Sequence, residues 1–301
     1  MPRSPLEFSG YAGLLLADSR PFLFKGITWA GGETVARVPH GLQKLGMDYY
    51  FDFLQGEKFN AVRFLFAHQS VLDDASISYT HFEPKANPQL VDADSGLGVS
   101  YIKSLVQLVR AAAAHDILVV LACQRLKANA PNYGLWYNDT LGVSEQSTFR
   151  GWELLADALC GEWNVVGVDL YQEPYRATWG SQNQRTDWKM GAERLGNHVL
   201  GRCSRWLVFV QGIHTAAPED GGATQGYFWV RLLRFEPLCC RREASALTSQ
   251  PCPLPAGREP SGRYEGTRPT VVARQTGLLA GARPIARCVA RACVAPVLAP
   301  A

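Results

Sequence analysis

Long apolar runs are missing from the 301-residue sequence. No stretch reaches the roughly 18 consecutive apolar residues that a membrane-spanning helix needs, so we expect no membrane partner. Phosphate-binding glycine loops, dinucleotide fingerprints and nucleic-acid motifs are missing too, which argues against a cofactor and against a nucleic-acid partner. The eight cysteines show no C-x-x-C spacing, so we expect no metal site. The N-terminal residues do not resemble a signal peptide, and localisation is therefore left open.

The charged residues are unevenly distributed about Val230. Residues 1–230 hold 19 of the 30 Lys and Arg and 23 of the 27 Asp and Glu. Residues 231–301 contain 11 Arg and 4 Glu, no Lys and no Asp, and nine of the 18 Pro. We therefore predict one domain over residues 1–230 and an irregular or disordered tail over residues 231–301. The tail composition is typical of a shifted reading frame or a retained intron, and a genuine basic tail is the alternative.

Strand and helix patterns alternate over the first 213 residues, and a long polar loop is expected over residues 68–97. The predicted strands are Phe22–Trp29, Asn60–Phe66, Ile117–Cys123, Val165–Leu170 and Trp206–Ile213. The predicted helices are Met47–Phe59, Ser100–Ala114, Ser147–Leu159 and Asp187–Leu200. Such alternation predicts an α/β fold with a parallel sheet, of which about five βα units are recognisable.

One carboxylate stands directly after a predicted strand. Glu173 follows the fourth apolar run, and Pro174 restricts the backbone just beyond it. In parallel barrels the reacting groups lie at the carboxyl ends of the strands. A carboxyl group there can protonate a leaving oxygen when its surroundings raise its pKa. The alternative is a surface glutamate in a turn between a strand and a helix.

The run VVGVDLYQEP (165–174) resembles a motif of glycoside hydrolase family 5, in which a strand ends in Asn-Glu-Pro and the Glu is the acid/base. Further runs are similar to motifs of the cellulase-like members: GITWAGGET (26–34), FNAVRFLF (59–66), LWY (135–137), ATWG (177–180), DWKMGAERLGN (187–197) and WLVFVQG (206–212). The resemblance covers roughly residues 20–229. It implies a (β/α)8 TIM barrel, incomplete here, that hydrolyses β-1,4-linked glucan polysaccharides or oligosaccharides by a retaining mechanism without a cofactor. Relatives of this kind are usually secreted.

The resemblance also implies a set of site residues. Glu173 is the acid/base, and Arg63, Gln172 and Gln124 line the sugar site. Trp29, Trp136 and Trp179 lie in strand-end loops, where aromatic rings can stack on sugar, and His214 is a further candidate contact with a structural role as its alternative. Three positions depart from the family pattern, because Gln172 replaces an Asn, Gln124 replaces a His and Gln211 replaces a Glu. For the tryptophans, packing in the core is the alternative to contact with sugar.

The second carboxylate of the retaining mechanism is not identified in the sequence. Retaining hydrolysis needs two carboxyl groups about 5–5.5 Å apart. The resemblance places the nucleophile on a seventh strand, but none of the five glutamates after residue 213 follows an apolar run. Glu33, near the end of the first strand, is a conceivable second carboxylate. The alternative to a hydrolase is a catalytically inactive carbohydrate-binding remnant or a defective gene product.

Three cysteines lie within the predicted domain: Cys123, Cys160 and Cys203. They occupy apolar or turn contexts, and we expect them to be free thiols.

Overall fold

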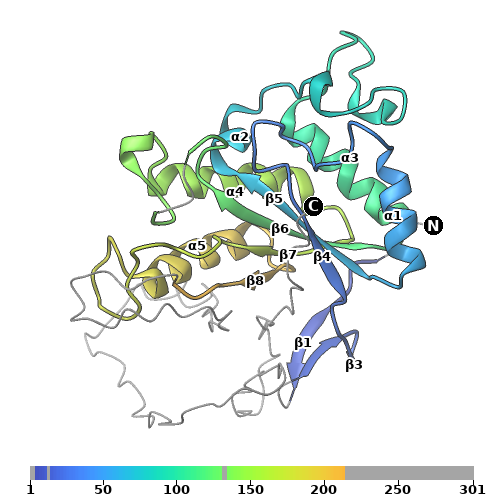
Figure 1. The fold of residues 1–301 in the computed structure, drawn as a ribbon. Helices are drawn as coiled ribbons and strands as arrows, with labels where there is room; N and C mark the ends of the chain where they lie inside the picture. Colours follow the sequence, from blue (N-terminus) through green and yellow to red (C-terminus); the bar gives the residue numbers. More distant parts are fainter. Residues whose placement is uncertain (1–3, 12–13, 131–133, 214–301) are drawn as a thin grey trace, which may run out of the picture.

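A computed structural model describes residues 4–11, 14–130 and 134–213 (Figure 1). Within them, five parallel strands form one sheet in the order β4-β5-β6-β7-β8. The strands are β4 (Gly26–Trp29), β5 (Ala61–Ala67), β6 (Leu118–Arg125), β7 (Val165–Asp169) and β8 (Leu207–Phe209). The α-helices are α1 (Met47–Gly56), α2 (His68–Asp73), α3 (Tyr101–Ala114), α4 (Glu145–Leu159) and α5 (Trp188–Arg202). This confirms the predicted parallel sheet with helical crossovers.

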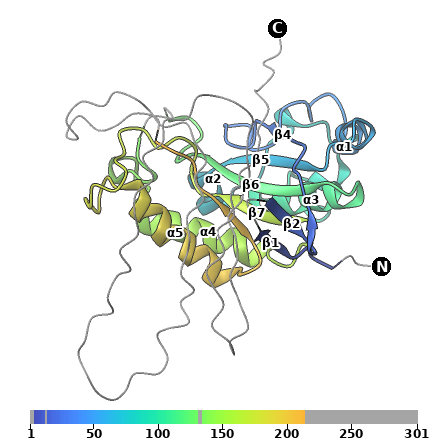
Figure 2. The same ribbon diagram turned by 90° about the horizontal axis from the view of Figure 1, so that it is seen from below.

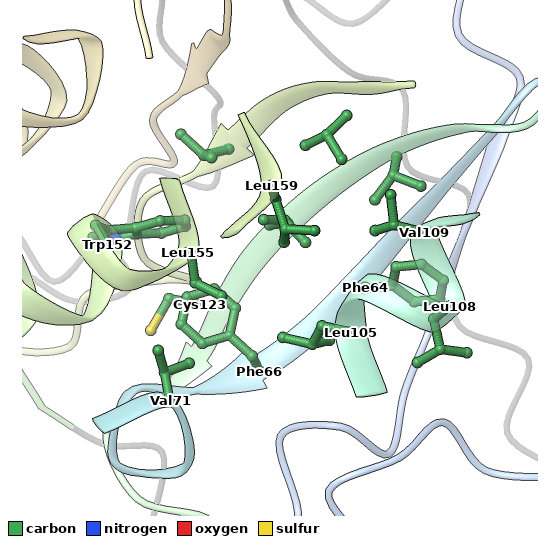
Figure 3. Close-up of a cluster of buried hydrophobic side chains, with 14 of the residues drawn as sticks. Phe64, Phe66, Val71, Leu105, Leu108, Val109, Cys123, Trp152, Leu155 and Leu159 are labelled. Atoms are coloured by element: carbon green, nitrogen blue, oxygen red, sulfur yellow. The ribbon is translucent and has the colours of Figure 1, made fainter. Parts of the chain in front are cut away.

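The larger core lies between the sheet and its helices (Figure 3). Alternate side chains of β5 and β6, such as Phe64, Phe66 and Leu121, are directed to this side, as the two-residue period of a strand requires. They pack against α3 and α4, where Leu108 and Trp152 are fully buried. Fully burying one large apolar side chain stabilises a fold by about 1.5–3 kcal/mol. None of the helices in the described residues is long and apolar enough to cross a lipid bilayer.

A small antiparallel sheet near the N-terminus packs against the amino ends of these strands. This N-terminal sheet consists of β1 (Phe8–Tyr11), β2 (Leu14–Ala17) and β3 (Arg20–Pro21), and it lies at one end of the larger sheet (Figures 1 and 2). Phe24 follows it and contacts Phe209 of β8, with ring centroids 6.2 Å apart. Side chains of this N-terminal sheet and Phe24 form one apolar cluster with Ala61 and Leu118, the first residues of β5 and β6. The cluster therefore closes the amino ends of the strands.

Several predicted boundaries differ from the structure. The predicted strand Phe22–Trp29 is shortened to β4, because Phe22 and Phe24 pack with the N-terminal sheet instead of pairing in the larger one. The predicted loop over residues 68–97 contains α2 and two short 3-10 helices, η1 (Tyr79–His81) and η2 (Pro88–Leu90). A third, η3 (Asp139–Leu141), precedes α4.

Cys160 and Cys203 form a disulfide, so the expectation that both are free thiols is wrong. Each cysteine directly follows a helix, α4 for Cys160 and α5 for Cys203. The Arg205 guanidinium donates to the carbonyl oxygens of Cys160 and Val165, both at 2.8 Å, and to that of Glu162. The two helix ends are thus joined covalently and by hydrogen bonds. Cys123 is a buried free thiol, as predicted.

Replacing both bridged cysteines, as Cys160→Ser/Cys203→Ser, should lower the free energy of unfolding by about 4 kcal/mol. The physical reason is that a cross-link between residues 43 apart restricts the unfolded chain. Urea denaturation of both proteins, with and without a reductant, measures the effect. The two stabilities should converge in reductant; a gap that persists there would assign the loss to packing instead.

Candidate functional site

Polar side chains from three strands meet at the carboxyl end of the sheet. Arg63 lies on β5, Asp169 ends β7, and Gln211 follows β8. Asp169 Oδ2 accepts hydrogen bonds from Arg63 Nε at 3.1 Å, from Arg63 Nη2 at 2.9 Å and from Gln211 Nε2 at 2.6 Å. Arg63 Nη2 also donates to Gln172 Oε1 at 3.1 Å. A single guanidinium therefore orients both a carboxylate and an amide at this edge.

The Arg63–Asp169 ion pair is buried, with exposed side-chain fractions of 11% and 6%. Burial raises the pKa of the Asp169 carboxyl, while the Arg63 guanidinium and the Gln211 amide act in the opposite direction. Its other oxygen, Oδ1, has no hydrogen-bond partner among the described residues. Buried ion pairs of this kind add little net stability, because desolvation offsets the attraction between the charges. Their value here is the fixed orientation of the groups around them.

Asp169 was not among the predicted site residues. Its signal in the sequence is a single acidic residue at the end of the apolar run VVGVD. In a strand buried on both faces, such a residue must find a charged or polar partner, and Arg63 on β5 is that partner. The connection crosses 106 residues of sequence, which no local pattern reveals.

Glu173 lies in the segment that follows β7, and its backbone is fixed on both sides. Gln172 N donates to Cys123 O and Tyr175 N donates to Gly134 O, both at 2.8 Å. Glu173 itself has φ +46°, in the left-handed region that costs a non-glycine residue about 1 kcal/mol or more. Strained residues of this kind are typical of functional sites, where surrounding contacts hold them. The side chain is half-buried.

Gln124, near the end of β6, is also half-buried at the same edge of the sheet. Its Oε1 atom is buried and has no hydrogen-bond partner among the described residues. Of the predicted sugar-site residues, the structure thus joins Arg63 and Gln172 by a direct hydrogen bond and places Gln124 on the adjoining strand.

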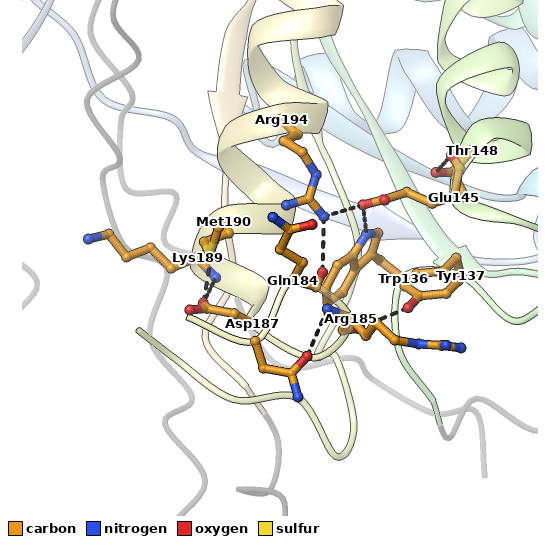
Figure 4. Close-up of polar contacts among 11 residues, drawn as sticks. Trp136, Tyr137, Glu145, Thr148, Gln184, Arg185, Asp187, Lys189, Met190 and Arg194 are labelled. Atoms are coloured by element: carbon orange, nitrogen blue, oxygen red, sulfur yellow. Dashed lines mark hydrogen bonds and ion pairs between the residues drawn. The ribbon is translucent and has the colours of Figure 1, made fainter. Parts of the chain in front are cut away.

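Trp136 does not line a site, and the prediction that it contacts sugar is wrong. Its exposed fraction is 1%, and its ring lies against Trp188 of α5, with centroids 5.1 Å apart. Its Nε1 donates to Glu145 Oε1 at 2.9 Å (Figure 4). The sequence placed it in a polar loop, but the loop folds back so that the indole enters the core.

Trp29 is largely buried as well, with 9% exposed. It packs against the rings of Tyr50, Phe51 and Phe64, and its Nε1 donates to His40 O at 2.8 Å. This packing favours a structural role over the stacking on sugar that was expected. Trp179 is half-buried in the segment after β7. His214 lies outside the described residues.

Glu33, considered as a second carboxylate, is 6% exposed, and its Oε2 accepts from Gly31 N at 2.7 Å. That bond closes the turn after β4 and gives Glu33 a local structural role. Among the described residues, no three His, Cys, Asp or Glu side chains are grouped so that they could hold a metal ion.

Active sites of parallel barrels lie at the carboxyl ends of the strands, and glycoside hydrolases use carboxyl groups there. The position of Glu173 at this edge of a parallel sheet is compatible with that class. The family model for cellulase (glycosyl hydrolase family 5) matches residues 17–234, so the chain belongs to this family. Its fold is accordingly that of the (β/α)8 barrel, of which the described residues form five consecutive strands.

Curated relatives agree with this assignment. An endoglucanase of Paenibacillus polymyxa is 31% identical over 207 residues, 68% of this chain and 49% of the relative. The major extracellular endoglucanase of Xanthomonas campestris pv. campestris is 29% identical over 219 residues, 72% of this chain and 42% of the relative. The chain thus spans about half the length of these relatives.

Solved structures of endoglucanases have a similar fold. An endocellulase from Pyrococcus horikoshii superimposes with a TM-score of 0.64 at 25% identity, over 73% of this chain and 60% of that chain. The catalytic domain of the Xanthomonas campestris endoglucanase gives a TM-score of 0.63 at 27% identity, over 74% and 61%.

Proposed function

We propose that this protein binds β-1,4-linked glucan at the carboxyl edge of its sheet and hydrolyses it with Glu173 as the general acid/base. The observation that carries the proposal is the position of Glu173. It stands beside Gln172, which Arg63 orients, and its strained backbone is fixed by hydrogen bonds on both sides. Solved relatives include endocellulase complexes with cellotetraose, which supports an oligosaccharide ligand.

A general acid at this position would protonate the glycosidic oxygen as the bond to the sugar breaks. The half-buried setting of Glu173 limits water around the carboxyl group. Gln172, at the position of the family Asn, would donate its amide N–H groups to a sugar hydroxyl, since Arg63 already occupies its carbonyl oxygen. Trp179 offers an aromatic face on which a sugar ring could stack.

Glu173→Gln should lower kcat/KM on soluble carboxymethyl cellulose by about 10²–10⁴-fold, the usual contribution of a general acid/base. The amide has almost the same shape but no proton to transfer at neutral pH, so the affinity for cellotetraose should remain. Reducing-end release and calorimetric titration measure the two quantities. Glu57→Gln, at an exposed position where α1 ends, is the matched control and should leave both unchanged.

A second candidate function is glucan binding without hydrolysis. It is favoured by a sequence observation: none of the glutamates after residue 213 follows an apolar run that could form a seventh strand. Binding of cellotetraose without turnover would support this second function. The absence of both binding and turnover would contradict hydrolysis and binding alike.

We also propose that residues 231–301 form a tail separate from the domain over residues 1–230.

A further inference from the structure

The loop after β7, residues 178–187, is a closed unit that carries Trp179. Its two ends pair as a short bridge, with Thr178 N donating to Thr186 O at 2.8 Å and Trp188 N donating to Thr178 O at 2.9 Å. The loop begins five residues after Glu173, and α5 starts directly after it. Its conformation therefore sets the position of an aromatic side chain at the same end of the sheet as the proposed acid/base.

Asp187 organises this loop from the inside. The residue is fully buried, with an exposed fraction of 0%. Its Oδ1 accepts from Gly180 N and Lys189 N, both at 3.0 Å, and from Met190 N at 3.4 Å. Its Oδ2 accepts from Gln182 N at 2.8 Å. The Asp187 carboxylate thus caps α5 and also accepts hydrogen bonds from the backbone N–H groups of Gly180 and Gln182 within the loop.

The Oδ2 contact supports an unfavourable conformation. Gln182 has φ +64°, a left-handed value that a non-glycine residue adopts only when other contacts stabilise it. The hydrogen bond to Asp187 is the contact that faces its N–H group. Losing this bond alone should loosen the loop at Gln182, while Oδ1 still accepts from Gly180 N and caps the start of α5.

Side chains from outside hold the same loop (Figure 4). Tyr137 Oη donates to Arg185 O at 3.0 Å, and Arg194 Nη2 donates to Gln184 O at 3.3 Å. Arg194 also pairs with Glu145 at 2.6 Å. These contacts fix residues 184–185. The half of the loop that contains Trp179 is held by Asp187 and by the hydroxyl of Thr178, which contacts the hydroxyls of Ser181 and Thr186 at 2.5 and 3.2 Å.

We propose that Asp187 is a positioning residue for glucan binding, acting through the backbone of the loop to hold Trp179 where a sugar ring can stack on it. The inference rests on the proposed function, since it assumes that glucan lies at this edge. Asp187 itself is buried and does not touch the sugar.

Asp187→Asn is the informative variant. An asparagine keeps one acceptor oxygen for the helix cap, and Asn is among the preferred capping residues. Its amide group then faces the N–H of Gln182, so two donors oppose each other and the loop bond is lost. We expect cellotetraose affinity to fall about fivefold, somewhat less than the roughly tenfold expected when Trp179→Ala removes the stacking ring.

A double-mutant cycle separates positioning from general destabilisation. Asp187→Asn should weaken cellotetraose binding in the wild-type background but have no further effect in the Trp179→Ala background. Ser144→Ala, which removes the cap of α4, is the control and should not change affinity. Hydrogen exchange of the amides of residues 178–186 should accelerate in Asp187→Asn and not in Ser144→Ala.

Equal weakening in both backgrounds, or no weakening in either, would overturn the positioning role. If Trp179→Ala leaves affinity unchanged, the inference is likewise overturned, whereas the proposed function stands as long as the wild type binds and hydrolyses glucan. A wild-type protein that binds no cellotetraose removes the proposed function and with it the role of Asp187 toward sugar; the exchange rates then report only on the loop.

Discussion

Gly191→Ala should lower the free energy of unfolding by about 2 kcal/mol, although alanine favours helices more than glycine does. Gly191 lies on α5, and a Cβ atom built on it would stand 2.3 Å from Trp136 Cζ2 and 2.6 Å from Trp136 Cε2. No real Cβ contact is that short, so either the helix or the indole must move.

Ring contacts and a hydrogen bond restrain the indole of Trp136. It packs against Trp188 and Tyr137, with ring centroids 5.1 and 5.4 Å away, and its Nε1 is hydrogen-bonded to Glu145. Overpacking a rigid core costs about 1–3 kcal/mol, occasionally more, and exceeds the gain of up to about 1 kcal/mol in helix propensity.

Gly201→Ala is the matched control, because Gly201 lies on the same helix with nothing within 4 Å of a built Cβ. It should leave the stability unchanged or raise it by up to about 1 kcal/mol. Urea denaturation followed by tryptophan fluorescence and by circular dichroism measures both variants. Equal stability of the two variants would show that Trp136 can be displaced without cost.

The close packing of Trp136 against Gly191 explains why sequence patterns placed Trp136 in a sugar site. A tryptophan between polar residues has the pattern of a surface aromatic, and the space that accepts it is made by a glycine 55 positions later. The sequence does contain both residues, but their contact is a property of the packing of α5 against the loop. By contrast, the strand preceding Glu173 was recognisable, because its first four residues are apolar or small, which is typical of a parallel strand.

The hidden parts of the site share this non-local origin. Asp169 and Arg63 are each single charges within apolar strands, and the sheet order brings them together. The disulfide joins the ends of two helices, so its pairing depends on how α4 and α5 lie side by side. The N-terminal sheet was missed because Phe22 and Phe24 alternate as a strand would, although their partners are Phe8 and Phe209.

The stability of the protein should fall below about pH 6.5 by an amount that depends on His68. This residue begins α2, is 1% exposed and lies between Phe66 and Trp152, with ring centroids 5.4 and 5.9 Å away. Gly151 of α4 leaves room for the ring, because a Cβ there would stand 2.6 Å from His68 Nδ1. Neither ring nitrogen has a hydrogen-bond partner among the described residues.

Burial lowers the pKa of His68 from 6.5 to about 3, so the folded protein keeps the ring neutral while the unfolded chain takes up a proton. The stability that the protein has with a neutral His68 is therefore fully present above about pH 6.5 and is lost as the pH falls from there toward 3. Each pH unit below 6.5 lowers the free energy of unfolding by about 1.4 kcal/mol, so the loss at pH 5 is about 2 kcal/mol.

His68→Leu should flatten this part of the pH profile, because leucine has a similar size and does not titrate. At pH 7.5 the variant should be as stable as the wild type or more so, since it removes two buried nitrogen atoms without partners. Urea unfolding between pH 7.5 and 5 measures both proteins, and other titrating groups cancel in the difference. His40→Leu, at an exposed position, should keep the wild-type slope. Parallel profiles for the wild type and His68→Leu would contradict this prediction, because they would mean that His68 takes up a proton as readily in the folded protein as in the unfolded chain.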